Sequence, residues 1–175
     1  MYYDYLTYWQ DKGQEPAAAL SSDFVIQIRK ILQEYEFYTV FELGCGDGQL
    51  SRILKELNCM ITGLDLSEDR LQMNNDIDVK LLSDFTKDDL NILKSDLVIC
   101  CNFLLHIKPK DIKFVLDKMV EYSSKYIIFI EPNPKTNLGK WEYYNFNHDY
   151  YDLIKNLNFK VIPLSNYTNC YIITK

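Results

Sequence analysis

Short apolar runs alternate with helical patterns along most of the chain, and this alternation is typical of an α/β protein with a parallel sheet. The apolar runs predict strands at residues 39–43, 60–65, 79–82, 96–101 and 126–130. Two more strands are predicted at 159–164 and 170–174, where a short polar segment joins them into a terminal antiparallel hairpin. The pattern therefore predicts seven strands with helices between them.

The helices are predicted from apolar residues at helical spacing and from the residues that precede them. One helix is predicted to begin at Asp23, after a serine cap, and a short one after Ser67. Thr86 and Asp89 are spaced as in a capping box, which predicts another short helix. Pro109 is predicted to open a further helix, and the last one begins at Tyr150.

The most informative stretch runs from Thr39 to Gln49. An apolar strand leads into Gly44, Gly46 and Gly48, and a helical pattern follows directly. Glycines let the backbone turn sharply and let a ligand approach it closely. A dinucleotide fingerprint needs a glycine at position 49, which is Gln, and no lysine follows as a phosphate loop requires. The stretch predicts a nucleotide site of another kind.

Two further strand ends carry polar residues that suit such a site. Asp65 ends the second strand, 21 residues after Gly44, where a carboxylate can accept hydrogen bonds from ribose hydroxyls. The fourth strand is a continuous apolar run that ends at Asn102, Phe103 and His106. Ligands of open α/β sheets bind outside these carboxyl ends, so we expect the site there.

The Glu-x-Gly-x-Gly-x-Gly form of residues 42–48 resembles motif I of the class I S-adenosylmethionine-dependent methyltransferases. The resemblance continues in order over roughly residues 40–175. It implies a three-layer Rossmann-like α/β sandwich, with a mostly parallel seven-stranded sheet and an antiparallel C-terminal strand. The implied activity is transfer of a methyl group from S-adenosylmethionine by in-line displacement.

The resemblance also implies which residues contact the cofactor. Glu42 would offset the cationic methionyl part, and the glycine loop would meet its carboxylate. Asp65 would bind the ribose, Asp84 the adenine amino group, and Phe85 would lie near the ring. The full set of implied cofactor residues is Glu42, Gly44, Cys45, Gly46, Asp65, Leu66, Asp84, Phe85, Cys101 and Asn102.

Aromatic residues cluster in two segments that suit an acceptor pocket. An N-terminal arm, residues 1–20, holds Tyr5, Tyr8 and Trp9, and an irregular segment, residues 135–149, holds Tyr143. These residues are predicted to wall the pocket, with the arm acting as a lid. The alternative is an arm that only packs on the edge of the domain.

His106 is the candidate general base, because an imidazole with an ordinary pKa of about 6.5 can accept a proton near neutral pH. It is one of only two histidines, and it follows the fourth strand directly. The alternative is a ring that bonds a backbone carbonyl group and takes no part in catalysis. His148, in the aromatic segment, is a weaker candidate for the same role.

Composition narrows the range of partners. At 175 residues the chain fits one domain, residues 1–175, and its net charge of −6 disfavours nucleic acid. Five cysteines without a Cys-x-x-Cys pair, no recognisable leader and no membrane-length apolar run indicate reduced thiols in the cytoplasm. No His or Cys spacing predicts a metal site.

These observations favour a methyltransferase with a small-molecule acceptor, without nucleic acid or membrane partners, and either monomeric or homodimeric. Two alternatives stay open. One is a methyltransferase that acts on protein or RNA, and the other is a non-catalytic S-adenosylmethionine-binding subunit of a complex.

Overall fold

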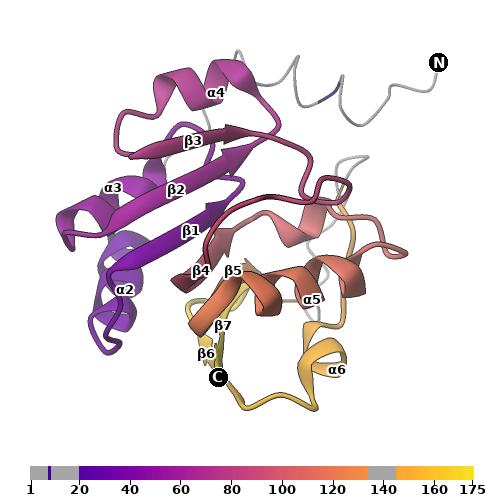
Figure 1. Cartoon of the computed structure of the whole chain (residues 1–175). Helices are drawn as coiled ribbons and strands as arrows, with labels where there is room; N and C mark the ends of the chain where they lie inside the picture. Colours follow the sequence, from indigo (N-terminus) through magenta and orange to yellow (C-terminus); the bar gives the residue numbers. More distant parts are fainter. Residues whose placement is uncertain (1–7, 9–19, 134–144) are drawn as a thin grey trace.

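A computed structural model describes Tyr8 and residues 20–133 and 145–175 (Figure 1). The described residues contain a seven-stranded sheet with the order β3-β2-β1-β4-β5-β7-β6. Only β7 runs against the other strands, since it pairs antiparallel with both β5 and β6. The strands are β1 (Thr39–Leu43), β2 (Met60–Asp65), β3 (Val79–Leu82), β4 (Ser95–Cys101), β5 (Ser123–Pro132), β6 (Phe159–Pro163) and β7 (Thr168–Thr174). The predicted fold class is confirmed.

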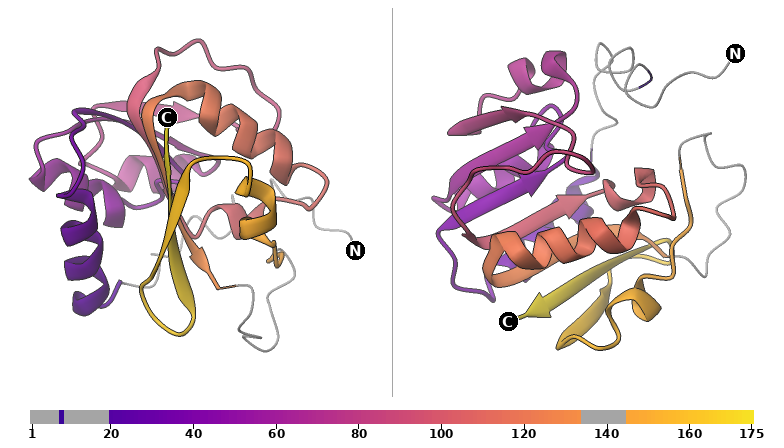
Figure 2. Two further views of the ribbon diagram at one scale, coloured as in Figure 1. Left: turned by 90° about the horizontal axis from the view of Figure 1, so that it is seen from below. Right: turned by 45° about the vertical axis from the view of Figure 1, so that its right-hand side comes forward.

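Helices cover both faces of the sheet (Figures 1 and 2). On one face lie α2 (Ser22–Leu32) and α3 (Gln49–Glu56), and on the other lie α5 (Ile112–Tyr122) and α6 (Tyr150–Ile154). The short α4 (Glu68–Met73) packs beside β2 and β3.

The sheet separates two hydrophobic cores, because successive side chains of a strand point to opposite faces. In β1, Val40 packs with residues of α2 and α3, whereas Phe41 packs with residues of α5 and α6. Strand β4 lies between β1 and β5 and is buried on both faces, which explains its continuous apolar sequence.

The strand order reverses between β1 and β4. From β1 the chain moves outward to β2 and β3, and then returns to place β4 on the other side of β1. The loops that leave the carboxyl ends of β1 and β4 therefore diverge, and a crevice opens between them. This is where the sequence predicted the site.

The predicted serine caps are confirmed. Ser21 accepts a hydrogen bond from the backbone N–H of Phe24 and begins α2, and Ser67 accepts one from Arg70 and begins α4. Among the helices of the described residues, none is both long and apolar enough to cross a membrane.

The prediction of a short helix from Thr86 and Asp89 is wrong. Residues 85–87 form a turn, in which the Asp84 carboxylate accepts hydrogen bonds from the backbone N–H and the hydroxyl of Thr86, at 3.0 and 2.6 Å. Asp88 accepts two more, from the Ser83 hydroxyl and the Asp84 N–H, at 2.6 and 2.8 Å. Aspartates that bond the nearby backbone in this way favour a turn over a helix.

Several boundaries also differ from the prediction; β7, for example, begins at Thr168 rather than at residue 170. Helix α5 begins at Ile112, and Pro109 lies in the turn that precedes it, where the Lys108 carbonyl accepts the N–H of Asp111. Strand β5 extends beyond the predicted 126–130, because its pairing with β7 continues to Pro132.

Candidate active site

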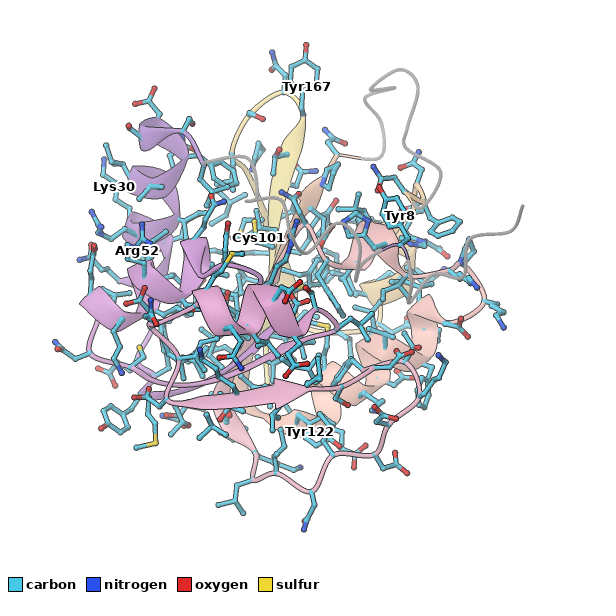
Figure 3. The ribbon with its side chains drawn as sticks, turned by 90° about the horizontal axis from the view of Figure 1, so that it is seen from above. Tyr8, Lys30, Arg52, Cys101, Tyr122 and Tyr167 are labelled. Carbon is cyan, nitrogen blue, oxygen red and sulfur yellow. The ribbon has the colours of Figure 1, made fainter. Side chains whose placement is uncertain are left out.

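A cavity lies at the carboxyl ends of β1 to β4, and it brings together every residue predicted to contact a cofactor. These wall residues are Glu42, Gly44, Cys45, Gly46, Asp65, Leu66, Asp84, Phe85, Cys101 and Asn102. His106, the candidate base, lines the same cavity. Figure 3 labels Cys101, at the end of β4, and shows it near the centre of the molecule in that view.

The glycine loop after β1 has the backbone form that its sequence predicted. Gly44, Gly46 and Gly48 all have positive φ, at 64°, 51° and 95°. A Cβ atom on Gly44 would come within 2.7 Å of the Phe103 ring, whereas one on Gly46 would have, among the described residues, only Arg70 near it, at 3.8 Å. Gly46 therefore leaves open space on the cavity side, where a ligand can approach the backbone.

Asp65 is fixed by two backbone groups at the end of β2. One carboxylate oxygen accepts the N–H of Gly46 and the other accepts the N–H of Ser67, both at 2.9 Å. Burial raises the pKa of Asp65, and these hydrogen bonds partly offset the effect. Since a carboxylate oxygen has two lone pairs, each can still accept a ligand hydroxyl.

Glu42 is a buried carboxyl group, with 2% of its surface exposed. The Ser51 hydroxyl donates to it at 2.6 Å, and the Asn74 amide donates to Ser51 at 2.9 Å. Burial raises the pKa of Glu42 to about 8, and the nearby charge of Asp65 adds to the effect. A cation bound beside Glu42 would favour the ionised carboxylate and lower this pKa.

Asp84 and Phe85 follow β3, and both line the cavity. Burial raises the pKa of Asp84, but hydrogen bonds from Lys87 and Thr86 outweigh it and leave the pKa below its usual value. The ring of Phe85 is only 2% exposed and packs edge-on against Phe41, with centroids 5.9 Å apart. Phe85 thus offers a ligand little of its ring.

Sequence reasoning missed Lys118, which holds this segment in place. Lys118 is a buried residue of α5. Its ammonium donates to the backbone carbonyls of Phe85, at 3.1 Å, and Asp88, and lies 4.7 Å from the centroid of the Phe85 ring. A lysine among the apolar positions of a predicted helix was the signal available in the sequence.

His106 reaches the cavity from a short turn after β4. It is the last residue of the 3-10 helix η1 (Leu104–His106), and the turn begins at Asn102, whose φ is 52°. Phe103 and Ile107 of the same turn also line the cavity.

Sequence reasoning also missed Glu131, which lies under this turn. Glu131 has no exposed surface, and its carboxylate accepts the backbone N–H groups of Phe103, Leu104 and Leu105, at 2.9, 2.8 and 3.2 Å. Burial raises its pKa to about 7, although these three hydrogen bonds act in the opposite direction. A charge at the end of an apolar strand was the available signal.

His148 does not belong to the wall of the cavity. Its ring is 5% exposed and its Nε2 lies 2.9 Å from the carbonyl oxygen of Ile107, so Nε2 carries the donated proton. Burial lowers its pKa, so the ring is neutral near pH 7. Because its Nε2 is bonded to a backbone carbonyl group and its ring lies outside the cavity wall, this geometry does not support the weaker hypothesis that His148 is the base.

The predicted acceptor residues are described only in part. Tyr8 is half-buried, and Figure 3 shows it on the other side of Cys101 from Arg52 and Lys30. Tyr5, Trp9 and Tyr143 lie outside the described residues. Within residues 20–133 and 145–175, no group of three or more His, Cys, Asp or Glu side chains could hold a metal ion.

The chain matches a family model described as a methyltransferase domain over residues 41–124. It is 28% identical over 109 residues to the ubiquinone biosynthesis O-methyltransferase of Hydrogenovibrio crunogenus, covering 58% of this chain and 45% of that protein. It is 26% identical over 130 residues to the small RNA 2'-O-methyltransferase of Mus musculus, covering 63% of this chain and 33% of that protein. The chain thus spans less than half the length of these curated relatives.

Solved structures share the fold over nearly the whole chain. Magnesium protoporphyrin IX methyltransferase from Synechocystis, with bound S-adenosylmethionine, superposes with a TM-score of 0.70 at 15% identity, covering 99% of this chain and 98% of that one. The DhpI–SAM–HEP complex superposes with a TM-score of 0.74 at 12% identity, covering 95% and 94%.

Proposed function

We propose, on the premise that the chain belongs to the class I S-adenosylmethionine-dependent methyltransferase family, that it transfers a methyl group from S-adenosylmethionine to a small molecule. One observation carries the proposal. The ten residues that the family resemblance implies for the cofactor line a single cavity, and the candidate base His106 lines it too. Residues 1–175 would act as one domain.

The residues around the cavity fit the parts of S-adenosylmethionine. The open backbone at Gly46 suits the carboxylate, and the buried Glu42 suits the cationic amino and sulfonium groups. Asp65, with lone pairs to spare on both oxygens, suits the ribose hydroxyls. Asp84, which also lines the cavity, would meet the adenine amino group. When bound, this cofactor supplies an activated methyl group on a cationic sulfur.

The residues of the protein would position the acceptor, exclude water and accept a proton. Phe103 and Ile107 provide an apolar wall next to His106. In this proposal the imidazole of His106 accepts the proton that the acceptor loses. Tyr8, with Tyr5, Trp9 and Tyr143, would close the pocket around the acceptor.

The net charge of −6 supports a small molecule over RNA, since proteins that bind a nucleic acid backbone neutralise its phosphates with Lys and Arg. RNA is the second candidate because one curated relative is a small RNA 2'-O-methyltransferase. A non-catalytic subunit that only binds S-adenosylmethionine is the third.

Methyl-labelled S-adenosylmethionine, incubated with the protein and with separate metabolite, protein and RNA fractions, tests the proposal. We expect label in the metabolite fraction, with an equal amount of S-adenosylhomocysteine released. The Asp65→Ala variant, assayed in parallel, should transfer much less. Label in RNA alone would replace the small-molecule proposal. Binding of the cofactor without transfer to any fraction would favour the non-catalytic subunit.

A further inference from the structure

The turn that carries His106 rests on a buried carboxylate. Three consecutive backbone N–H groups, from Phe103 to Leu105, point at the two oxygens of Glu131. These N–H groups lie at the start of η1, where no carbonyl of the same helix can accept them. A charged acceptor makes stronger hydrogen bonds than a neutral one, so Glu131 fixes the start of the turn.

A second element fixes the other end of the turn. The N–H of Phe146 donates to the carbonyl oxygen of Leu105 at 2.7 Å, and the ring of His148 donates to the carbonyl oxygen of Ile107 at 2.9 Å. His148 also packs edge-on against the ring of Tyr150, at 5.6 Å between centroids. Burial raises the pKa of the Tyr150 hydroxyl, and the nearby charge of Glu131 adds to this effect. Tyr150 therefore lies close to both Glu131 and His148.

The turn contributes Phe103 and His106 to the wall of the cavity. Phe103 packs over Gly44, the first glycine of the loop after β1, and leaves no space there for a Cβ atom. His106 lies three residues further and borders the same cavity. A shift of the turn would therefore move the imidazole relative to the glycine loop.

We propose that Glu131 and His148 are positioning residues that clamp residues 102–107 from two sides and thereby aim His106 into the cavity. The proposal rests on the proposed function for its catalytic consequence. The clamp itself is a property of the fold, and it can be measured without an acceptor. Glu131 acts through the backbone of the turn, and His148 through the carbonyl group of Ile107.

The experiment replaces each anchor by a close mimic and follows the turn directly. In Glu131→Gln, the amide oxygen can keep the N–H groups of Phe103 and Leu104, but its NH₂ group would face the N–H of Leu105. We expect the Leu105 amide to exchange its hydrogen at least tenfold faster by NMR. Glu121→Gln, a change at an exposed glutamate of α5, is the matched control and should leave the exchange unchanged.

His148 offers a second pair of variants. His148→Gln keeps a nitrogen donor for Ile107 and should preserve slow exchange in the turn, whereas His148→Leu removes the donor and should accelerate it. Because the chain has only two histidines, the imidazole signals of His106 and His148 can be assigned by substitution. In Glu131→Gln the His106 signal should shift, while affinity for S-adenosylhomocysteine stays within about fivefold, since the cofactor residues lie mostly on other elements.

Once a methyl acceptor is identified, kcat should fall at least tenfold in Glu131→Gln, and KM for S-adenosylmethionine should change little. A folded Glu131→Gln whose Leu105 amide and His106 signal match the wild type would overturn the proposal. If that variant does not fold, equal exchange in His148→Leu and His148→Gln would overturn it instead. A protein that fails to bind S-adenosylhomocysteine would refute the proposed function and still leave the exchange data to judge the clamp.

Discussion

Glu42 should make the affinity for S-adenosylmethionine depend on pH. The side chain is 2% exposed and burial raises its pKa to about 8, so it is largely protonated at pH 7 in the free protein. A bound cation beside it favours the carboxylate and lowers the pKa. Binding then releases a proton, and affinity should rise with pH until Glu42 is ionised in the free protein as well.

The size of the effect follows from the pKa in the two states. Each unit by which binding lowers the pKa is worth about 1.4 kcal/mol at full effect. If the bound pKa returns to the ordinary value of 4.5, affinity at pH 8 should exceed affinity at pH 6 by about 50-fold, or about 2.3 kcal/mol. At pH 7 nearly one proton should leave for each cofactor bound.

Isothermal titration calorimetry with S-adenosylmethionine at pH 6, 7 and 8, in two buffers with different ionisation enthalpies, measures both quantities. Glu42→Gln should remove most of the pH dependence. Glu131→Gln is the matched control, because Glu131 has a pKa of about 7 and is also buried, but it contacts the turn after β4. The reasoning fails if the wild type binds equally at pH 6 and pH 8, or if Glu42→Gln keeps the wild-type dependence.

Three further changes probe the rest of the site. Gly46→Val puts a branched side chain at a φ of 51° and into the cavity, so it should cost about 1–3 kcal/mol of stability and abolish S-adenosylhomocysteine binding; a folded variant that binds normally would contradict this. His106→Ala should lower turnover by about 10²–10⁴-fold and remove the ascending limb of the pH–rate profile, and identical profile shapes would exclude a base role. Deletion of residues 1–10 should leave cofactor affinity within a few-fold and cut turnover, whereas full turnover would mean that the arm is no lid.

The strands, and the residues that line the cavity, could be predicted because their signals are local. The strand at 39–43 leads directly into a glycine at position 44, and the structure places it at those residues. Gly44, Gly46 and Asp65 stand where the strands β1 and β2 end, so the sheet itself brings them together. Local pattern and tertiary structure agree at these positions.

Two of the misses, Glu131 and Lys118, depend on contacts between distant segments. Glu131 bonds backbone groups 26 to 28 residues earlier in the chain, and no periodicity marks such a bond. Lys118 holds a carbonyl group 33 residues away. The helix expected at Thr86 failed for a local reason, because the carboxylates of Asp84 and Asp88 bond the backbone and compete with helix formation.

The proposed function requires that the cavity at the ends of β1 to β4 holds the methyl donor. Calorimetric titration of S-adenosylhomocysteine into the wild type and into Asp65→Ala tests it most directly. We expect one-to-one binding to the wild type, no binding of NAD, and a loss of about 1.5–3 kcal/mol, more than tenfold in affinity, in the variant. A folded Asp65→Ala that binds S-adenosylhomocysteine as tightly as the wild type would contradict it.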